Sequence, residues 1–341
     1  MRTMFRTGIL TVSLTALLAV PALAGPTVDK IKKADALTCG VSTGLPGFSN
    51  ADSQGKFTGL DVDVCKAIAA ALLGSAEKVK YVPLTAQQRF TALQSGEVDL
   101  LSRNTTWTQQ RDTALGLNFA PVVYYDGQGF MVPAKLGVKS ARELKGATVC
   151  VSPGTTTELN LADYFRANKM EFKPVVIEDL NEVRAAFFAG RCDVYTTDAS
   201  GLASIRATKA QNPGDYIILP EIISKEPLAP VVRHGDDEFF DIVKWVIYAL
   251  IEAEETGITS ANIAEMAKSE NPVIKRLLGT TPGMGKSLGL DEQWAYRTIQ
   301  QVGNYGEIFD RTLGKNSPLK LERGLNALWT QGGLMYAWPI R

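Results

Sequence analysis

This 341-residue chain is almost without histidine, and it has no metal-ligand motif and no nucleophile motif. Its single histidine, His234, stands in a charged His-Gly-Asp-Asp loop, where a solvated surface role is expected. No cysteine belongs to a C-x-x-C pair or lies next to the histidine, so no metal site is expected. The G-x-S-x-G elbow and the P-loop are also missing. The sequence therefore predicts no catalytic residue, no cofactor and no metal, which argues against an enzyme.

Net charge is equally scarce. The chain has 36 basic and 36 acidic residues, and residues 1–24 contribute only Arg2 and Arg6, which leaves 34 basic residues in the remainder. Such a balance offers no electrostatic basis for binding nucleic acid or an anionic membrane. We therefore expect neither as a partner.

The first 24 residues have the pattern of a cleavable export signal. A basic start precedes a mostly apolar stretch, Gly8–Val20, and a small-x-small cleavage pattern at Pro21–Ala24. The apolar stretch is shorter than the ~20 residues of a spanning helix, and no basic stop-transfer run follows it. We predict a signal peptide at residues 1–24 and a periplasmic location for the rest. The lack of a cysteine right after the cleavage site argues against a lipid anchor.

The few cysteines are even in number, which suggests disulfides in an oxidising compartment. The natural pairing puts one bridge in each of the two lobes described below, although the sequence leaves three connectivities open and four buried free thiols are an alternative. In that pairing the bridges are Cys39–Cys65 and Cys150–Cys192.

Strand-like and helix-like runs alternate in two blocks. The first block predicts strands at residues 37–41, 78–84 and 98–101 and a helix at 64–72. The second block predicts strands at residues 147–151, 173–177 and 192–195 and helices at 159–168 and 180–189. In the matching segments ALQSGEVDLL and AFFAGRCDVY, a helix ends on glycine and a strand follows around an aspartate. This alternation indicates two similar α/β lobes with parallel sheets, which bind ligands at the carboxyl ends of their strands.

Two extended, proline-marked stretches flank the second block. We interpret Phe119–Pro133 and Ile217–Val232 as paired crossover strands at a hinge, after which a helix at Phe239–Glu254 returns to the first lobe. The charged residues within that helix argue against a membrane span. The predicted fold is an α/β fold of two lobes, with a cleft between them and a two-stranded hinge.

This organisation predicts three segments after the signal peptide. Residues 25–125 form the first part of lobe 1, residues 126–225 form lobe 2, and residues 226–341 return to lobe 1 and end in a helical C-terminal extension. The aromatic residues of the extension are expected to pack against lobe 1 rather than bind ligand: Trp294, Tyr296, Tyr305, Trp329 and Trp338.

A polar cluster at residues 102–112, SRNTTWTQQRD, begins where a parallel strand ends. It offers hydroxyls, an amide, backbone N–H groups and, one helical turn further on, Arg111. These are the donors that an α-carboxylate requires. The alternative is a turn that caps the next helix, with Arg111 on the surface.

Two further positions can hold charge at the ends of strands. Gly154–Thr157 lies between a strand and a helix N-terminus, which is suited to an anion but also to ordinary helix capping. Asp198 follows the strand at residues 192–195, and its carboxylate can pair with an α-ammonium group or serve only in a turn.

The order of these segments resembles the polar amino-acid-binding family of periplasmic solute receptors, solute-binding protein family 3. It is most similar to the general L-amino-acid receptors that serve ABC importers. The resemblance covers nearly the whole chain after residue 24 and rests on CGVSTGLPGFS, FTGLDVDVCKAIAAAL, FTALQSGEVDLLSRNTTWTQQRD, VCVSPGTTTELNLADYF, GRCDVYTTDASGL and QVGNYGEIFDR with the tail GLNALWTQGGLMYAWPIR. It implies the type II periplasmic binding protein fold, a free amino acid as ligand and a membrane permease as partner of a monomer.

The resemblance also implies the roles of individual residues. Arg111 would hold the ligand α-carboxylate, with help from Thr106, Asn104 and the N–H groups at Thr156. Asp198, in the other half of the cleft, would hold the α-ammonium.

The side-chain pocket departs from the pattern of narrow-specificity relatives. The turn from Leu45 to Phe48 would form an apolar wall, and Thr85 with Ala86 would form a second wall. Many relatives carry an aromatic near Leu45 and small serines at the positions of Arg103 and Asn104. These differences are compatible with broad or polar specificity.

Two other functions fit the same scaffold. A dehydratase-like periplasmic enzyme would need an acid–base pair, for which only Asp198 and Glu158 are candidates. A ligand-sensing module would present the same lobes to a receptor kinase, but the chain carries no fused signalling domain. We therefore expect a binding protein of an amino-acid importer.

Overall fold

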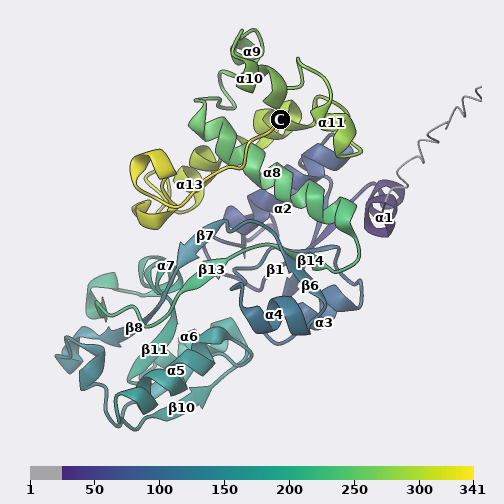
Figure 1. The fold of residues 1–341 in the computed structure, drawn as a ribbon. Helices are drawn as coiled ribbons and strands as arrows, with labels where there is room; N and C mark the ends of the chain where they lie inside the picture. Colours follow the sequence, from purple (N-terminus) through teal and green to yellow (C-terminus); the bar gives the residue numbers. More distant parts are fainter. Residues whose placement is uncertain (1–24) are drawn as a thin grey trace, which may run out of the picture.

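The computed structural model describes residues 25–341, so the predicted signal peptide lies outside the described residues. Two five-stranded sheets dominate this part of the chain, and each is the centre of one body, lobe 1 and lobe 2 (Figure 1). Parallel pairing is present in both sheets, as predicted. Each sheet also gains antiparallel strands from chain that crosses between the lobes.

The sheet of lobe 1 has the order β4-β1-β5-β14-β6. Its strands are β1 (Leu37–Ser42), β4 (Val79–Leu84), β5 (Leu100–Leu101), β6 (Leu117–Phe119) and β14 (Val231–Arg233). The helices before the crossing are α1 (Pro26–Ala34), α2 (Leu60–Leu73), α3 (Arg89–Gln94) and α4 (Gln109–Ala114). A short hairpin joins β2 (Asn50–Ala51) and β3 (Phe57–Thr58).

Helix α2 begins four residues before the predicted start at residue 64. Gly59 precedes it with a φ of 132°, and a Cβ there would lie 2.1 Å from the carbonyl oxygen of Phe48. Glycine thus permits the chain to turn into the helix directly beneath the turn at residues 45–48. As a result, Asp61 lies in the first turn of a buried helix.

The sheet of lobe 2 has the order β10-β9-β11-β8-β12. Its strands are β8 (Gln128–Pro133), β9 (Thr148–Val151), β10 (Lys173–Val176), β11 (Val194–Asp198) and β12 (Tyr216–Ile218). Its helices are α5 (Thr156–Ala167), α6 (Leu180–Phe188) and α7 (Ala199–Lys209). Strand β11 extends three residues beyond its predicted end, so Asp198 is its last residue, directly before α7.

The predicted two-stranded hinge is present. Strands β7 (Tyr124–Asp126) and β13 (Glu226–Leu228) pair in antiparallel fashion, with Asp126 opposite Glu226, and run between the two bodies (Figure 1). The side-chain amide of Asn326, far along the chain, makes two hydrogen bonds with β7. Its oxygen accepts from the Tyr125 N–H (2.6 Å), and its nitrogen donates to the Tyr125 carbonyl (3.1 Å).

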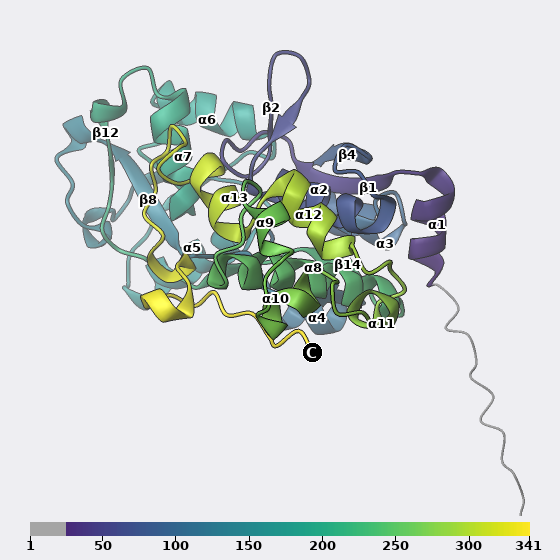
Figure 2. The same cartoon turned by 90° about the horizontal axis from the view of Figure 1, so that it is seen from above.

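After the second crossing the chain packs helices onto lobe 1, as predicted (Figure 2). They are α8 (Asp237–Glu255), α9 (Ile263–Met266), α10 (Pro272–Leu277), α11 (Met284–Ser287), α12 (Trp294–Val302) and α13 (Tyr305–Thr312). Trp294 and Tyr305 are buried and Tyr296 packs partly buried against this core, but Trp329 and Trp338 are 51% and 54% exposed, so not all tail aromatics are core residues. From residue 25 onward, no helix is both long and apolar enough to cross a membrane.

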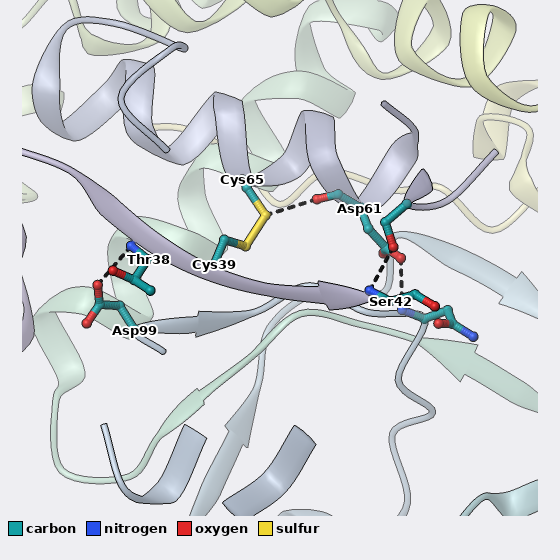
Figure 3. The surroundings of a disulfide bond; sticks show 8 residues. Thr38, Cys39, Ser42, Asp61, Cys65 and Asp99 are labelled. Carbon is teal, nitrogen blue, oxygen red and sulfur yellow. Dashed lines mark hydrogen bonds between the residues drawn. A yellow bond between two sulfur atoms is a disulfide. The ribbon is translucent and has the colours of Figure 1, made fainter. Parts of the chain in front are cut away.

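Both disulfides of the natural pairing are present. Cys39 of β1 bonds to Cys65 of α2 in the space between this strand and this helix (Figure 3), and Cys150 of β9 bonds to Cys192. Each bridge ties a central strand of its sheet to a neighbouring segment of the same lobe, so it can stabilise one lobe without restraining the hinge.

Removing the Cys150–Cys192 bridge is expected to lower the free energy of unfolding by roughly 3–4 kcal/mol, because the denatured chain regains the entropy of a long loop. Urea unfolding of the Cys150→Ser/Cys192→Ser variant measures this. The Cys39→Ser/Cys65→Ser variant is the matched control with the shorter loop, 26 against 42 residues of separation, and should lose slightly less. A loss below about 1 kcal/mol in both variants would contradict the estimate.

Candidate functional site

A cleft of about 610 Å³, counting its open mouth, lies between the lobes. Lobe 1 contributes the strand ends and loops after β1, β4 and β5, and lobe 2 contributes the start of α5, α6 and the end of β11. The lining residues that carry the argument are Leu45, Arg89, Arg103, Asn104, Thr106, Thr156, Arg184 and Asp198. The carboxyl ends of the strands thus meet at one place, as expected for parallel sheets.

The two lobes are in direct contact across this cleft. The hydroxyl of Thr85 donates to Glu178 Oε1 (2.6 Å), and Arg184 Nη2 donates to the carbonyl of Gly44 (2.8 Å). Ser204 Oγ donates to the carbonyl of Pro46 (2.7 Å). The described conformation is therefore closed.

Asp198 provides a buried carboxyl group in the cleft. Its side chain is only 7% exposed. Burial raises its pKa well above the ordinary value, and the neighbouring carboxylates of Asp126 and Glu226 raise it further; Arg89 and a hydrogen bond from Asn104 oppose this shift. A carboxylate in such surroundings is strongly stabilised by a cation placed against it.

Arg89 and Arg111 converge on the opposite side. Both guanidiniums donate to the carbonyl of Gly154, at 3.3 Å and 3.5 Å, and Arg111 Nη1 also donates to the carbonyl of Thr106 (3.0 Å). Burial lowers the pKa of both side chains. Arg111 also lies over the ring of Phe90, which holds it by a cation–π contact. The guanidinium of Arg111 has five N–H donors, so these two bonds leave donors for an anion.

Glu226, at the start of hinge strand β13, organises the polar groups of both lobes. It is 1% exposed, and it accepts from Thr106 Oγ1 (2.5 Å) and Thr156 Oγ1 (2.8 Å), as well as from Asn160 (2.8 Å) and Ser224 (2.6 Å). Because a hydroxyl has one hydrogen, Thr106 and Thr156 present lone pairs rather than donors to the cleft. The donors at this end are the unpaired backbone N–H groups at the start of α5.

Asn104 adopts a left-handed backbone with a φ of 32°. Its N–H donates to Asp61 Oδ2 (3.0 Å), and the neighbouring Arg103 Nε donates to the carbonyl of Leu84 (2.9 Å). Figure 3 shows Asp61 at the start of α2, near the end of β1. Burial raises the pKa of Asp61 to about 7 despite the Asn104 N–H and Arg103, and burial lowers the pKa of Arg103 to about 10. Asp61 therefore fixes the loop that presents Asn104.

The Asp61→Asn variant is expected to gain stability relative to the natural chain as the pH rises. The folded-state pKa of Asp61 is raised above that of the unfolded chain, so the folded protein binds more protons between pH 3.8 and about 7, and its stability falls as pH rises through that window. From pH 5 to pH 8 the difference in unfolding free energy should shift by roughly 2–3 kcal/mol in favour of the variant. Urea unfolding at both pH values checks this, and a constant difference would rule out the assignment.

The structure brings most of the predicted site residues to the cleft, but not all. Leu45, Arg103, Asn104, Thr106, Thr156 and Asp198 line it. Phe48 is 1% exposed and packs edge-on against Tyr124 at a centroid distance of 5.3 Å, so it lies beneath the wall rather than in it. Thr85 lies at the rim and bonds Glu178, while Arg111 stands behind the lining next to Gly154.

Sequence reasoning missed Arg89, Glu178 and Arg184 in the cleft lining, and it missed Glu226, which lies behind Thr106 and Thr156. Thr85 and Gln88 bond each other in the pattern of a capping box, and this local signal could have placed Arg89 in a first turn at the strand ends. Glu226 lies in the predicted hinge stretch, but its burial depends on how two distant segments pair. Nothing in the local pattern of α6 distinguishes Arg184 from a surface residue.

The fold and the cleft define a class: a two-lobed receptor whose closed cleft is lined by charged groups of both signs and is suited to a small charged solute. Residues 37–260 match the bacterial extracellular solute-binding proteins, family 3, and the chain belongs to this family.

Close relatives match nearly the whole chain. The General L-amino acid-binding periplasmic protein AapJ of Rhizobium johnstonii is 61% identical over 330 residues, 96% of each chain. The Glutamate/glutamine/aspartate/asparagine-binding protein BztA of Rhodobacter capsulatus is 60% identical over 331 residues, 97% of each chain. A solved ABC transporter/periplasmic binding protein from Brucella ovis with glutathione bound has a TM-score of 0.90 and 56% identity, and the match covers 92% of this chain and 99% of that one.

These similarities confirm the resemblance and the fold class derived from the sequence. They also confirm that this is a binding protein and not an enzyme, because the family and the relatives are solute-binding proteins. The dehydratase-like alternative is therefore not favoured.

Proposed function

We propose that this chain captures free L-amino acids in the periplasm and delivers them to an ABC importer. The observation that carries the proposal is the cleft between the lobes, lined by Asp198 of lobe 2 and by Arg89 of lobe 1, with the guanidinium of Arg111 of lobe 1 directly behind the lining at Gly154. A zwitterionic amino acid carries one positive and one negative charge, so its ammonium group can pair with the carboxylate and its carboxylate with a guanidinium. The relatives whose names state amino-acid binding support the same class of ligand.

The α-ammonium group is assigned to Asp198 and the α-carboxylate to Arg111. The raised pKa of the buried Asp198 carboxyl supports the first assignment, because an ammonium ion replaces the lost hydration of the carboxylate. The N–H groups at Thr156 support the second, because they belong to the N-terminus of α5, two residues from the Gly154 that Arg111 contacts, and a helix N-terminus favours an anion. Thr106 supports this end through its carbonyl, which holds Arg111, while the side chain of Asn104 hydrogen-bonds Asp198 at the ammonium end.

The side-chain end is assigned to Leu45, Thr85 and Arg103, with Phe48 supporting Leu45 from below. Its mixed apolar and charged character supports broad specificity. Relatives described as binding glutamate, glutamine, aspartate and asparagine, or with glutathione bound, support polar ligands in particular.

We propose that the free energy of ligand binding closes the two lobes around the ligand. Only the closed form offers both charged anchors, so the ligand shifts the hinge equilibrium toward it. Exclusion of water strengthens both ion pairs. Reversing a 1:99 ratio to 99:1 requires roughly 5.5 kcal/mol of differential affinity, which two buried charge-assisted contacts can supply. The closed shape would then be recognised by the permease.

The remaining assignments are part of this proposal. Residues 1–24 act as the export signal, residues 25–125 and 226–341 form lobe 1, and residues 126–225 form lobe 2. The protein works as a monomer with permease subunits in the inner membrane.

Calorimetry with the twenty amino acids tests the proposal. Free L-amino acids should bind with one site per chain. N-acetylated and amidated forms of the best ligand, each lacking one of the two charges, serve as matched controls and should bind at least about 100-fold more weakly, since each leaves a buried charge unpaired. A panel in which no amino acid binds, or in which the blocked forms bind equally well, would defeat it.

A further inference from the structure

Arg184 of α6 is a buried cation without an anionic partner among the described residues. It is 4% exposed and lines the cleft from lobe 2. Its bonds go to neutral groups: Nη2 donates to the Gly44 carbonyl (2.8 Å), and the side chain bonds Tyr195. Its Nε is buried and has no hydrogen-bond partner in residues 25–341.

An unpaired N–H on a buried guanidinium is costly, because the group has lost water and gained no acceptor. Such an atom in the wall of a ligand cleft is accounted for when the ligand supplies the acceptor. A carboxylate satisfies both needs, since it accepts the hydrogen bond and pairs with the charge.

Arg184 lies away from the position assigned to the α-carboxylate. Arg89 also has a buried Nε without a partner, but it shares the Gly154 carbonyl with Arg111 and belongs to that end of the cleft. Arg184 instead contacts Gly44, the residue before the wall at Leu45. The cleft therefore has two cationic ends.

The charges around Arg184 permit an anion there. The acidic residues in the cleft lining are Asp198 and Glu178. Asp198 faces Arg89 and Asn104, and it lies close enough to raise the pKa of Tyr195. Glu178 is exposed and accepts from Thr85 at the rim.

We propose that Arg184 forms a second anion subsite, which selects amino acids with a further carboxylate at the end remote from the α-carbon. The inference rests on the proposed function and names its substrate class. Two sources share this chemistry: a free acidic amino acid, and a γ-glutamyl peptide whose C-terminal carboxylate reaches further along the cleft. Arg184 also hydrogen-bonds the Gly44 carbonyl of lobe 1. A ligand carboxylate bound to Arg184 would therefore lie where the two lobes meet at the side-chain end of the cleft.

Calorimetry at pH 7 with L-glutamate, its uncharged isostere L-glutamine and γ-L-glutamylglycine tests the subsite. The natural protein should bind L-glutamate at least about tenfold more tightly than L-glutamine, the scale of one hydrogen bond between charged groups. In Arg184→Gln this preference should disappear through loss of L-glutamate affinity, with L-glutamine changed less than about threefold. Arg184→Lys, which keeps the charge, should retain part of the preference. If γ-L-glutamylglycine loses affinity in the same way and binds more tightly than L-glutamate, the peptide is the source; the reverse order identifies the free amino acid.

Three results would overturn the inference. One is a natural protein that binds L-glutamate no better than L-glutamine, which decides the matter even if the variants fail to fold. Another is an equal loss for both ligands in Arg184→Gln, which would make Arg184 only a latch on Gly44. The third is an unchanged preference in that variant. Failure of the proposed function is distinct, because no amino acid, L-alanine included, would then bind the natural protein.

Discussion

Replacing Asp198 by Asn is expected to weaken the binding of every amino-acid ligand by at least about 100-fold. The change keeps the size of the side chain but leaves a buried α-ammonium without its charged partner, a loss on the order of 2–5 kcal/mol. The measurement is the calorimetric dissociation constant of the best ligand from the panel.

The same substitution should not destabilise the protein without ligand. Asp198 is a buried carboxyl whose pKa is raised by burial and by Asp126 and Glu226, so its ionised form is unfavourable in the folded chain when no cation is present. Asp163→Asn is the matched control, because Asp163 is exposed on α5 and pairs with the neighbouring exposed Arg166. Unaltered affinity in Asp198→Asn, or a similar loss in the control, would contradict the assignment.

Replacing Arg111 by Met is expected to weaken binding at least about tenfold. Roughly 1.5–3 kcal/mol is lost with a hydrogen bond to a charged group, and Met retains the apolar contact with Phe90. The loss should be the same for amino acids with different side chains, because the α-carboxylate is common to all of them. Calorimetry with one small and one acidic ligand checks both points.

Arg166→Met is the control for this variant, since Arg166 is an exposed arginine on α5. If Arg111→Met binds as tightly as the natural chain, Arg111 serves only to hold Thr106 and Gly154 in place, and the carboxylate must be held by Arg89 or by the N–H groups of α5 alone.

The lobes and the hinge could be derived from the sequence because they depend on local signals, whereas the disulfide pairing was one of three connectivities that the sequence left open. Alternation of strands and helices, glycine at helix ends and proline at the crossings are all readable along the chain. The pairing of β7 with β13 follows from the two proline-marked stretches, whereas the start of α2 does not, because it depends on the approach of Gly59 to Phe48.

The site was only partly predictable, for a physical reason. Asp198, Thr106 and Asn104 follow directly from strand ends. Glu226 and Arg184 act through partners 120 and 140 residues away in the sequence, and the contact of Arg184 with Gly44 joins the two lobes across the closed cleft. Phe48 shows the opposite error, because a residue in the wall turn is in fact part of the core.

A crystal structure of the protein with a bound L-amino acid tests the central claim most directly. The account predicts the α-ammonium within hydrogen-bond distance of the Asp198 carboxylate, and the α-carboxylate against the Arg111 guanidinium and the first N–H groups of α5. A ligand bound outside the cleft, or one whose ammonium and carboxylate both face a single lobe, would contradict it.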